Sequence, residues 1–160
     1  MATQVIQPFR VAGPYTLAIP VRGGTAPVSE TWKRGALLAR SSGRLIEAGA
    51  DPTLIVGVAI HDVTVTVAGD EVKYVPAHLG VEFEGSLMGA AAANYTLVQT
   101  DMYLTYGVAA DATTGYWYID QSDTSANLVV ITGFVDPVGD INARVRFIFL
   151  QAGTLAGIAL

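Results

Sequence analysis

The sequence predicts a mainly β protein: an antiparallel, barrel-like domain with one short helix and an extended N-terminal arm. Apolar and polar residues alternate with a period of two in several short segments, most clearly in the Val-Thr-Val-Thr-Val of residues 63–67. Such alternation is expected where a strand buries only one face. Turn residues separate these segments at intervals of about 8 to 12 residues, which is typical of sandwiches and barrels.

The first predicted element is an arm over residues 1–14. It places isolated apolar side chains among prolines and a glycine, before the first clear strand. A terminal segment has little of its own domain to bury against, so these side chains suggest docking on a neighbouring chain. An edge strand of the same domain is the open alternative. Residues 15–160 are then expected to form one β-rich domain, because 160 residues are most simply a single domain.

Strands fill most of this domain. Pro20 moves the first of them toward a sheet edge or a bulge, and Ser42-Gly43 and Asp51-Pro52 provide tight turns after the second and third. The predicted strands cover residues 15–22, 35–40, 44–48, 54–60, 63–67, 71–75, 79–84, 115–120, 127–132 and 144–150.

Residues 85–106 depart from the period of two. The alanine run 90–93 favours helix, and the apolar residues between Leu97 and Leu104 are compatible with a helical face. The sequence therefore predicts one short helix of about two to three turns in this segment.

The composition points to a partner. Hydrophobic residues make up 51% of the chain and charged residues only 14%, which leaves few charges to cover a lone monomer. Burial of apolar surface against other proteins is therefore expected, the alternative being an all-β protein that is simply rich in alanine and glycine. The chain has no cysteine, so its stability must come from the core or from assembly rather than from disulfides.

Two classes of partner are not expected. No run approaches the roughly 20 apolar residues that cross a bilayer, and the first residues do not resemble a signal peptide, so we expect no membrane partner and synthesis in a cytoplasm. A net charge of −5 argues against nucleic-acid binding, because phosphate contacts need a basic face.

Charge is unevenly distributed. Between Lys73 and Arg144 there are eight acidic residues and no lysine or arginine, whereas positive charge gathers around the first predicted hairpin. A basic hairpin that faces an acidic region of an adjacent copy would give a head-to-tail contact. Ordinary solvated strand edges are the alternative. The basic residues concerned are Lys33, Arg34, Arg40 and Arg44.

The sequence indicates no catalytic centre and no cofactor or metal. The histidines His61 and His78 lie apart, and His61-Asp62 would point to opposite faces of a strand. No metalloprotease, phosphate-loop or serine-elbow motif is present. The aspartate pairs 120/123 and 136/140 lack the dense spacing of a calcium loop and are interpreted as turn residues.

Two blocks of sequence carry a family resemblance. In residues 33–62, a strand with Gly-Ala-Leu-Leu, a Ser-Gly turn, a return strand, an Asp-Pro turn and Ile-Val-Gly-Val-Ala follow one another. Residues 106–150 contain Tyr-Gly-Val, Tyr-Trp-Tyr-Ile-Asp, Val-Val-Ile-Thr-Gly, Asp-Pro and Arg-Val-Arg-Phe-Ile-Phe-Leu. This order resembles head decoration, or capsid cement, proteins of tailed bacteriophages, of the β-tulip type.

The resemblance implies a structural role rather than an activity. Such a protein would bind the major capsid protein on the outer surface of the head, as a homotrimer at local threefold positions. It would stabilise the virion against the pressure of its DNA and would be made in the host cytoplasm. The candidate partner-binding residues are Ile6, Phe9, Arg10, Val11, Lys33, Arg34, Tyr116 and Tyr118.

Other functions stay open at this point. Residues 116–118, Tyr-Trp-Tyr, place two tyrosines on one strand face and a tryptophan on the other. We interpret Trp117 as a core residue and the tyrosines as interface residues. A phage tail-associated carbohydrate- or ligand-binding module that uses these rings is the alternative, and a hydrolase built on His61 or His78 is a more distant one.

Overall fold

The computed structural model describes residues 1–12, 21–77 and 80–150, and the chain in these ranges is mainly β, as the sequence predicts. The elements are β1 (Arg10–Val11), β2 (Arg22–Thr25), β3 (Thr31–Trp32), β4 (Leu37–Ser41), β5 (Arg44–Glu47), β6 (Gly57–Ala59), β7 (Val63–Thr64), β8 (Glu71–Pro76), β9 (Phe83–Met88), η1 (Ala90–Ala92), η2 (Gln99–Asp101), β10 (Thr105–Ala110), β11 (Trp117–Asp120), β12 (Val129–Phe134) and β13 (Arg144–Phe149).

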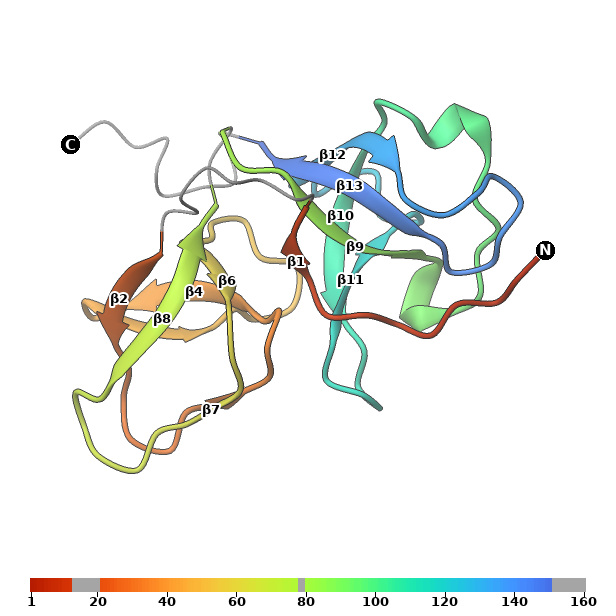
Figure 1. The fold of residues 1–160 in the computed structure, drawn as a ribbon. Helices are drawn as coiled ribbons and strands as arrows, with labels where there is room; N and C mark the ends of the chain where they lie inside the picture. The colour runs from red at the N-terminus through yellow and green to blue at the C-terminus, as the bar shows by residue number, and fades with distance from the viewer. Residues whose placement is uncertain (13–20, 78–79, 151–160) are drawn as a thin grey trace.

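The strands form two units that lie side by side in Figure 1. In the barrel unit, formed by residues 1–12 and 80–150, the strands run in the order β9-β11-β10-β12-β13, and β13 pairs again with β9 to close the ring. In the sheet unit, residues 21–77, five strands run in the order β2-β8-β6-β4-β5 beside the small β3-β7 pair. The predicted barrel-like fold is therefore confirmed.

The barrel is mostly antiparallel. Only the pairing of β11 with β9 is parallel among its described strands. Its core is aromatic: the rings of Phe83, Phe147 and Phe149 contact one another with centroids between 5.2 and 5.9 Å apart. A ring closed in this way leaves no free sheet edge within the barrel wall.

The N-terminal segment is extended, as predicted, but it lies on its own barrel. Gln4 donates its main-chain N–H to the carbonyl oxygen of Ile141 at 2.8 Å, and β1 pairs with the first half of β9. Phe9 is only 1% exposed and packs against Phe147 at 5.0 Å between ring centroids. This part of the chain corresponds to the edge-strand alternative. Residues 13–20, which include the end of the predicted arm and most of the first predicted strand, lie outside the described residues.

The two units are in close contact at a glycine. Gly35 lies in the turn between β3 and β4 with φ of +84°, and a Cβ atom there would lie 2.5 Å from the main-chain nitrogen of Phe9. Only glycine combines this backbone conformation with so close an approach. The turn therefore presses directly on the N-terminal segment, and the hydrophobic core is continuous across the junction of the units.

The predicted helix of two to three turns is wrong in extent: the segment holds two single 3₁₀ turns, η1 and η2. In the alanine run, Ala91 and Ala92 take φ of +53° and +58°, and Ala92 donates its N–H to the hydroxyl of Tyr118 at 3.0 Å. The N–H of Gly89 bonds to the carbonyl of Ala93, which closes a tight loop. These contacts override the helix propensity of alanine. Neither turn is long enough to cross a membrane.

A buried carboxylate organises the second turn. Asp101 is 2% exposed and accepts hydrogen bonds from the hydroxyls of Tyr95 and Tyr106, each at 2.9 Å, and from the N–H of Val98. Burial, and next the hydrogen bond to Asp101, raises the pKa of Tyr95 to about 12. The pKa of Tyr106 is raised for the same reasons. Asp101 thereby ties the loop before β10 to the barrel.

Candidate functional site

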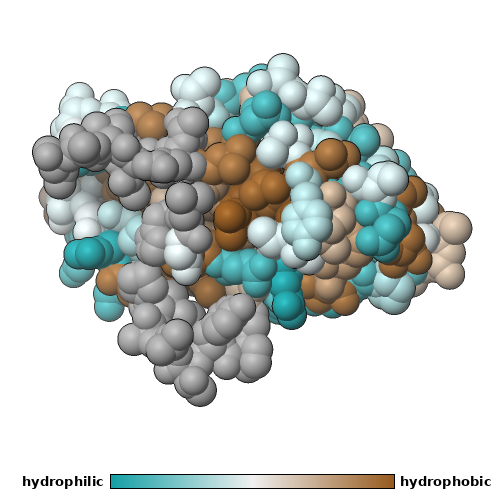
Figure 2. Space-filling model, turned by 90° about the horizontal axis from the view of Figure 1, so that it is seen from above, coloured by the Kyte–Doolittle hydropathy of each residue, from teal (hydrophilic) through white to brown (hydrophobic). Residues whose placement is uncertain are grey.

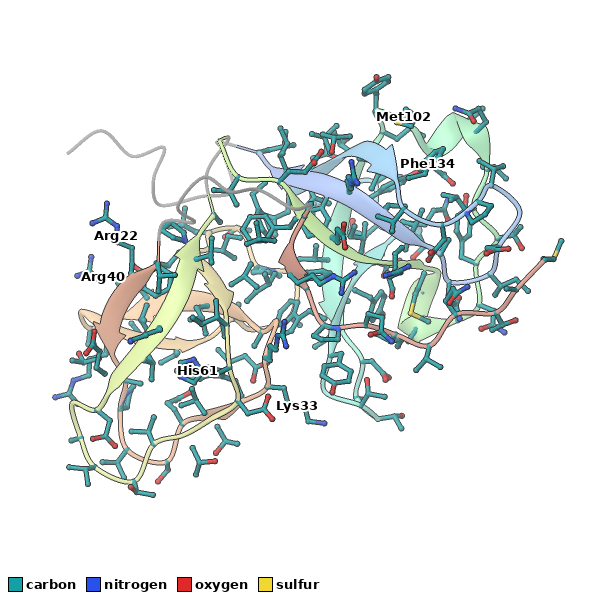
Figure 3. The ribbon with its side chains drawn as sticks, in the orientation of Figure 1. Arg22, Lys33, Arg40, His61, Met102 and Phe134 are labelled. Carbon is teal, nitrogen blue, oxygen red and sulfur yellow. The ribbon has the colours of Figure 1, made fainter. Side chains whose placement is uncertain are left out.

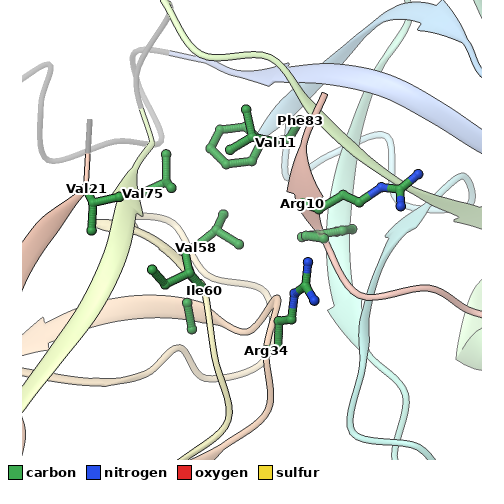
Figure 4. A pocket seen from close by; sticks show the side chains of 10 residues that line it. Arg10, Val11, Val21, Arg34, Val58, Ile60, Val75 and Phe83 are labelled. Carbon is green, nitrogen blue, oxygen red and sulfur yellow. The ribbon is translucent and has the colours of Figure 1, made fainter. Parts of the chain in front are cut away.

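An apolar groove opens where the two units meet (Figure 4). It has a volume of about 300 Å³. The barrel side is formed by Val11 and Phe83, which are partners in the β1–β9 register. The sheet side is formed by the register partners Val58 and Val75 together with Ile60. On the face shown in Figure 2, hydrophobic side chains gather in the middle of the molecule.

Two arginines lie at one end of this groove, as Figure 4 shows. Arg10 donates its Nε–H to Oε2 of Glu84 at 2.9 Å, and Glu84 is itself almost fully buried on β9. Arg34 donates its main-chain N–H to Oδ1 of Asp62 at 2.7 Å, but its guanidinium has no hydrogen bond or ion pair with any described residue. The groove therefore combines apolar walls with an exposed positive charge that has no partner in the described part of the chain.

A second depression, which we call the acidic cleft, also borders both units. It has a volume of about 530 Å³, and stretches of alanine and glycine in residues 48–50 and 109–112 leave it open. Trp117 donates its indole N–H to Oε1 of Glu47 at 2.9 Å across the junction. Lys33 lies 5.0 Å from the centroid of the Tyr116 ring and donates to the carbonyl of Thr114. The carboxylates that line the cleft belong to Glu47, Asp51 and Asp111.

Several predicted partner-binding residues meet at these depressions. Phe9, Arg10, Val11 and Arg34 all line the groove, although they come from both units, and Lys33 lines the acidic cleft in contact with Tyr116. Phe9 contributes through its ring in the core, so it shapes the groove rather than projecting from it. The sequence analysis did not single out three other groove residues, because the pattern around them predicts only ordinary strands. These residues are Val58, Ile60 and Val75.

Two predicted contact residues lie away from the junction. Ile6 is half-buried on the N-terminal segment. Tyr118 is 2% exposed, because β11 lies between β9 and β10 and the loop at η1 covers its outer side. Its hydroxyl accepts the N–H of Ala92, so the prediction of Tyr118 as a surface contact is wrong.

The aromatic triplet does not form an exposed stacking platform. Trp117 is 1% exposed, which confirms its interpretation as a core residue. Of the three rings only Tyr116 is partly exposed, and the ammonium of Lys33 lies over it. Sugars stack on accessible ring faces, so this strand does not present the surface that the carbohydrate-binding alternative requires.

The histidines considered as catalytic candidates do not form a catalytic site among the described residues. His61 is exposed, and the neighbouring carboxylate of Asp62 is engaged by the main chain of Arg34. His78 lies outside the described residues.

The aspartate pairs are engaged by neighbouring groups. Asp123 accepts main-chain N–H groups of the following turn, which lowers the pKa of its carboxyl. Asp136 is paired with Arg144 at 2.7 Å. Within the described ranges, no three histidine or acidic side chains gather as metal ligands.

No protein-family model matches this chain, and no curated protein is significantly similar to it. The two depressions are therefore interpreted from their own geometry and chemistry.

Proposed function

We propose that this protein is a non-catalytic bacteriophage capsid decoration protein. It binds the major capsid protein on the outer surface of the head as an oligomer, by this account a homotrimer, and stabilises the shell against internal DNA pressure. The observation that carries the proposal is the groove between the two β units, with its apolar walls and an arginine whose guanidinium has no partner among the described residues. The resemblance of residues 33–62 and 106–150 to decoration proteins supports it.

The groove has the chemistry of a protein-docking site. Val21 and Ile60, which line it, are 47% and 37% exposed. Covering such side chains contributes about 25 cal/mol per Å² of apolar surface removed from water. The exposed guanidinium of Arg34 can bind a carboxylate with two parallel hydrogen bonds, which adds directional specificity. Arginine is enriched among the residues that contribute most of the binding energy of protein interfaces.

The two blocks that resemble decoration proteins fall on different units. Residues 33–62 supply β4, β5 and β6 of the sheet unit, and residues 106–150 supply most of β10 together with β11, β12 and β13 of the barrel. The first block contributes Arg34 and residues 58–60 directly to the lining of the groove. The second block contributes no lining residue, and it builds the barrel strands that pair with β9 behind the groove. Repetition of one modest contact by symmetry within an oligomer raises the overall affinity through effective concentration, without any new contact.

Replacing Ile60 by aspartate is expected to weaken binding to purified, expanded capsids at least tenfold, because it places a charge within the apolar groove. Val67→Asp is the matched control: Val67 is 61% exposed and does not line the groove. Co-sedimentation with capsids measures binding, and urea unfolding of each variant verifies the fold. Equal binding of both variants would exclude the groove as the docking site. Failure of the wild-type protein to sediment with capsids would exclude the proposed function.

A further inference from the structure

The turn between β4 and β5 forms a basic tip. Arg40 and Arg44 flank it on the two strands, both are exposed, and neither has an ion pair with any residue that the structure describes. Figure 3 shows Arg40 at the far end of the sheet unit, with Arg22 of β2 beside it. Gly24 of β2 approaches Leu45 of β5 closely, which holds these strands together. Arg22, Arg40 and Arg44 define the basic tip.

The acidic cleft lies at the opposite end of the same hairpin. β5 begins at Arg44 in the tip and ends at Glu47, whose carboxylate lines the cleft. Asp51 and Asp111 add two carboxylates, and the only cation among the cleft-lining residues is Lys33, which is engaged by Thr114 and Tyr116. The cleft thus has an excess of negative charge, and the tip carries positive charge alone.

A tip cannot reach the cleft of its own chain. Arg44 and Glu47 are three residues apart on an extended strand, so their side chains point to opposite faces of the sheet, and the tip points away from the junction. The two surfaces can therefore meet only between copies. A contact between different patches on two copies is heterologous, and it closes into a ring when the rotation permits.

The cleft is large enough to hold part of another chain, and it is lined by a residue whose hydrogen-bond donor has no acceptor among the described residues. Its volume of about 530 Å³, bordered by alanines and glycines, can accept long side chains. Trp32 lines the cleft and is 3% exposed, and its indole N–H has no acceptor within the described part of the chain. Unsatisfied buried donors are unfavourable. The incoming turn offers hydroxyl and carbonyl oxygens at Ser41 and Ser42.

We propose that the basic tip of one copy docks in the acidic cleft of the next copy. The contact pairs Arg40 and Arg44 with the carboxylates of Glu47 and Asp51 across a head-to-tail interface. This inference deepens the oligomeric part of the proposed function and rests on it. Because the contact is electrostatic and partly exposed, added salt weakens it.

The test measures self-association of the full chain without capsids. Sedimentation velocity gives the oligomeric state, and tryptophan emission gives the site, because the only two tryptophans of the chain, Trp32 and Trp117, both line the cleft. Arg44→Glu is expected to weaken association about tenfold or more and to abolish the concentration-dependent change in emission. Lys73→Glu, an equal charge reversal at an exposed residue of the sheet unit outside the cleft, leaves both unchanged.

A complementary pair makes the test specific. Ala112→Lys adds a cation to the cleft and is expected to reduce self-association. Mixing this variant with Arg40→Glu/Arg44→Glu is expected to give a heterodimer, because the unaltered tip of the first variant meets the unaltered cleft of the second. A wild-type monomer at all micromolar concentrations, or no difference between Arg44→Glu and Lys73→Glu, would overturn the interface. If the wild-type protein does not self-associate through this contact but still binds capsids, the proposed function stands without this interface. If association behaves as expected but capsids are not bound, the proposed function fails alone.

Discussion

Replacing Phe9 by alanine is expected to lower the free energy of unfolding by about 3 to 5 kcal/mol. The ring is 1% exposed and packs on Phe147 in the barrel core. It also lies close to Gly85, where an added Cβ atom would be 2.4 Å from the ring. Removal of the ring therefore leaves a cavity between β1, β9 and β13 that this closed barrel cannot easily fill.

Urea unfolding followed by near-ultraviolet circular dichroism measures this effect. Val5→Ala serves as the control, because Val5 lies in the same segment but is 73% exposed, and it should change the unfolding free energy by less than about 0.5 kcal/mol. If Phe9→Ala leaves stability nearly unchanged and instead weakens capsid binding, the segment acts as a free arm and its position on the barrel is wrong.

Asp101→Ala is expected to cost about 2 to 4 kcal/mol, because it removes the shared acceptor of two tyrosine hydroxyls and one main-chain N–H in a buried site. Asp70→Ala, at an exposed turn aspartate, should cost about 0.5 kcal/mol or less. Chemical denaturation of both variants compares the two costs. Equal values would show that the buried network does not stabilise the loop before β10.

The same network makes stability sensitive to high pH. The pKa of Tyr95 is about 12 in the folded protein, against about 10 in an unfolded chain, so folding favours the neutral phenol. This stabilisation is fully present below about pH 10 and is lost as the pH rises through about 12. Ultraviolet titration at the phenolate band should show the buried phenols ionising late, and earlier in Asp101→Ala. Native tyrosines that all titrate near pH 10 would contradict the network.

Strands that bury one face were predictable in part, because alternation is a local property. The clearest alternation, in residues 63–67, nevertheless forms only the two-residue strand β7. The predicted 144–150 corresponds to β13 and 44–48 to β5. By contrast, β9 is buried along its whole length, and its predicted end at Glu84 is four residues early. Gly85 opens the segment for which the sequence predicts a helix, yet it lies in β9, where its lack of a side chain makes room for the ring of Phe9. Only the tertiary contact explains that glycine.

The candidate site was predictable only in part. The sequence indicated four groove residues, because they are apolar or basic residues of the N-terminal segment or of the start of the first hairpin. They are Phe9, Arg10, Val11 and Arg34. Their meeting in one groove depends on pairings between segments far apart in the sequence, such as β1 with β9. No sequence pattern predicted the acidic cleft. Its alanines and glycines form it only because their small side chains leave space between the two units.

Stabilisation of the capsid shell is the central claim, and comparison of decorated with stripped capsids on heating tests it most directly. A protein that binds only the intact, expanded shell stabilises it by RT ln(1 + [L]/Kd), about 2.7 kcal/mol per site at a hundredfold excess over Kd. Many sites act on one particle, so we expect DNA release, followed with an intercalating dye, at a clearly higher temperature for capsids that carry the protein. Release at the same temperature from decorated and stripped capsids would contradict the proposed function.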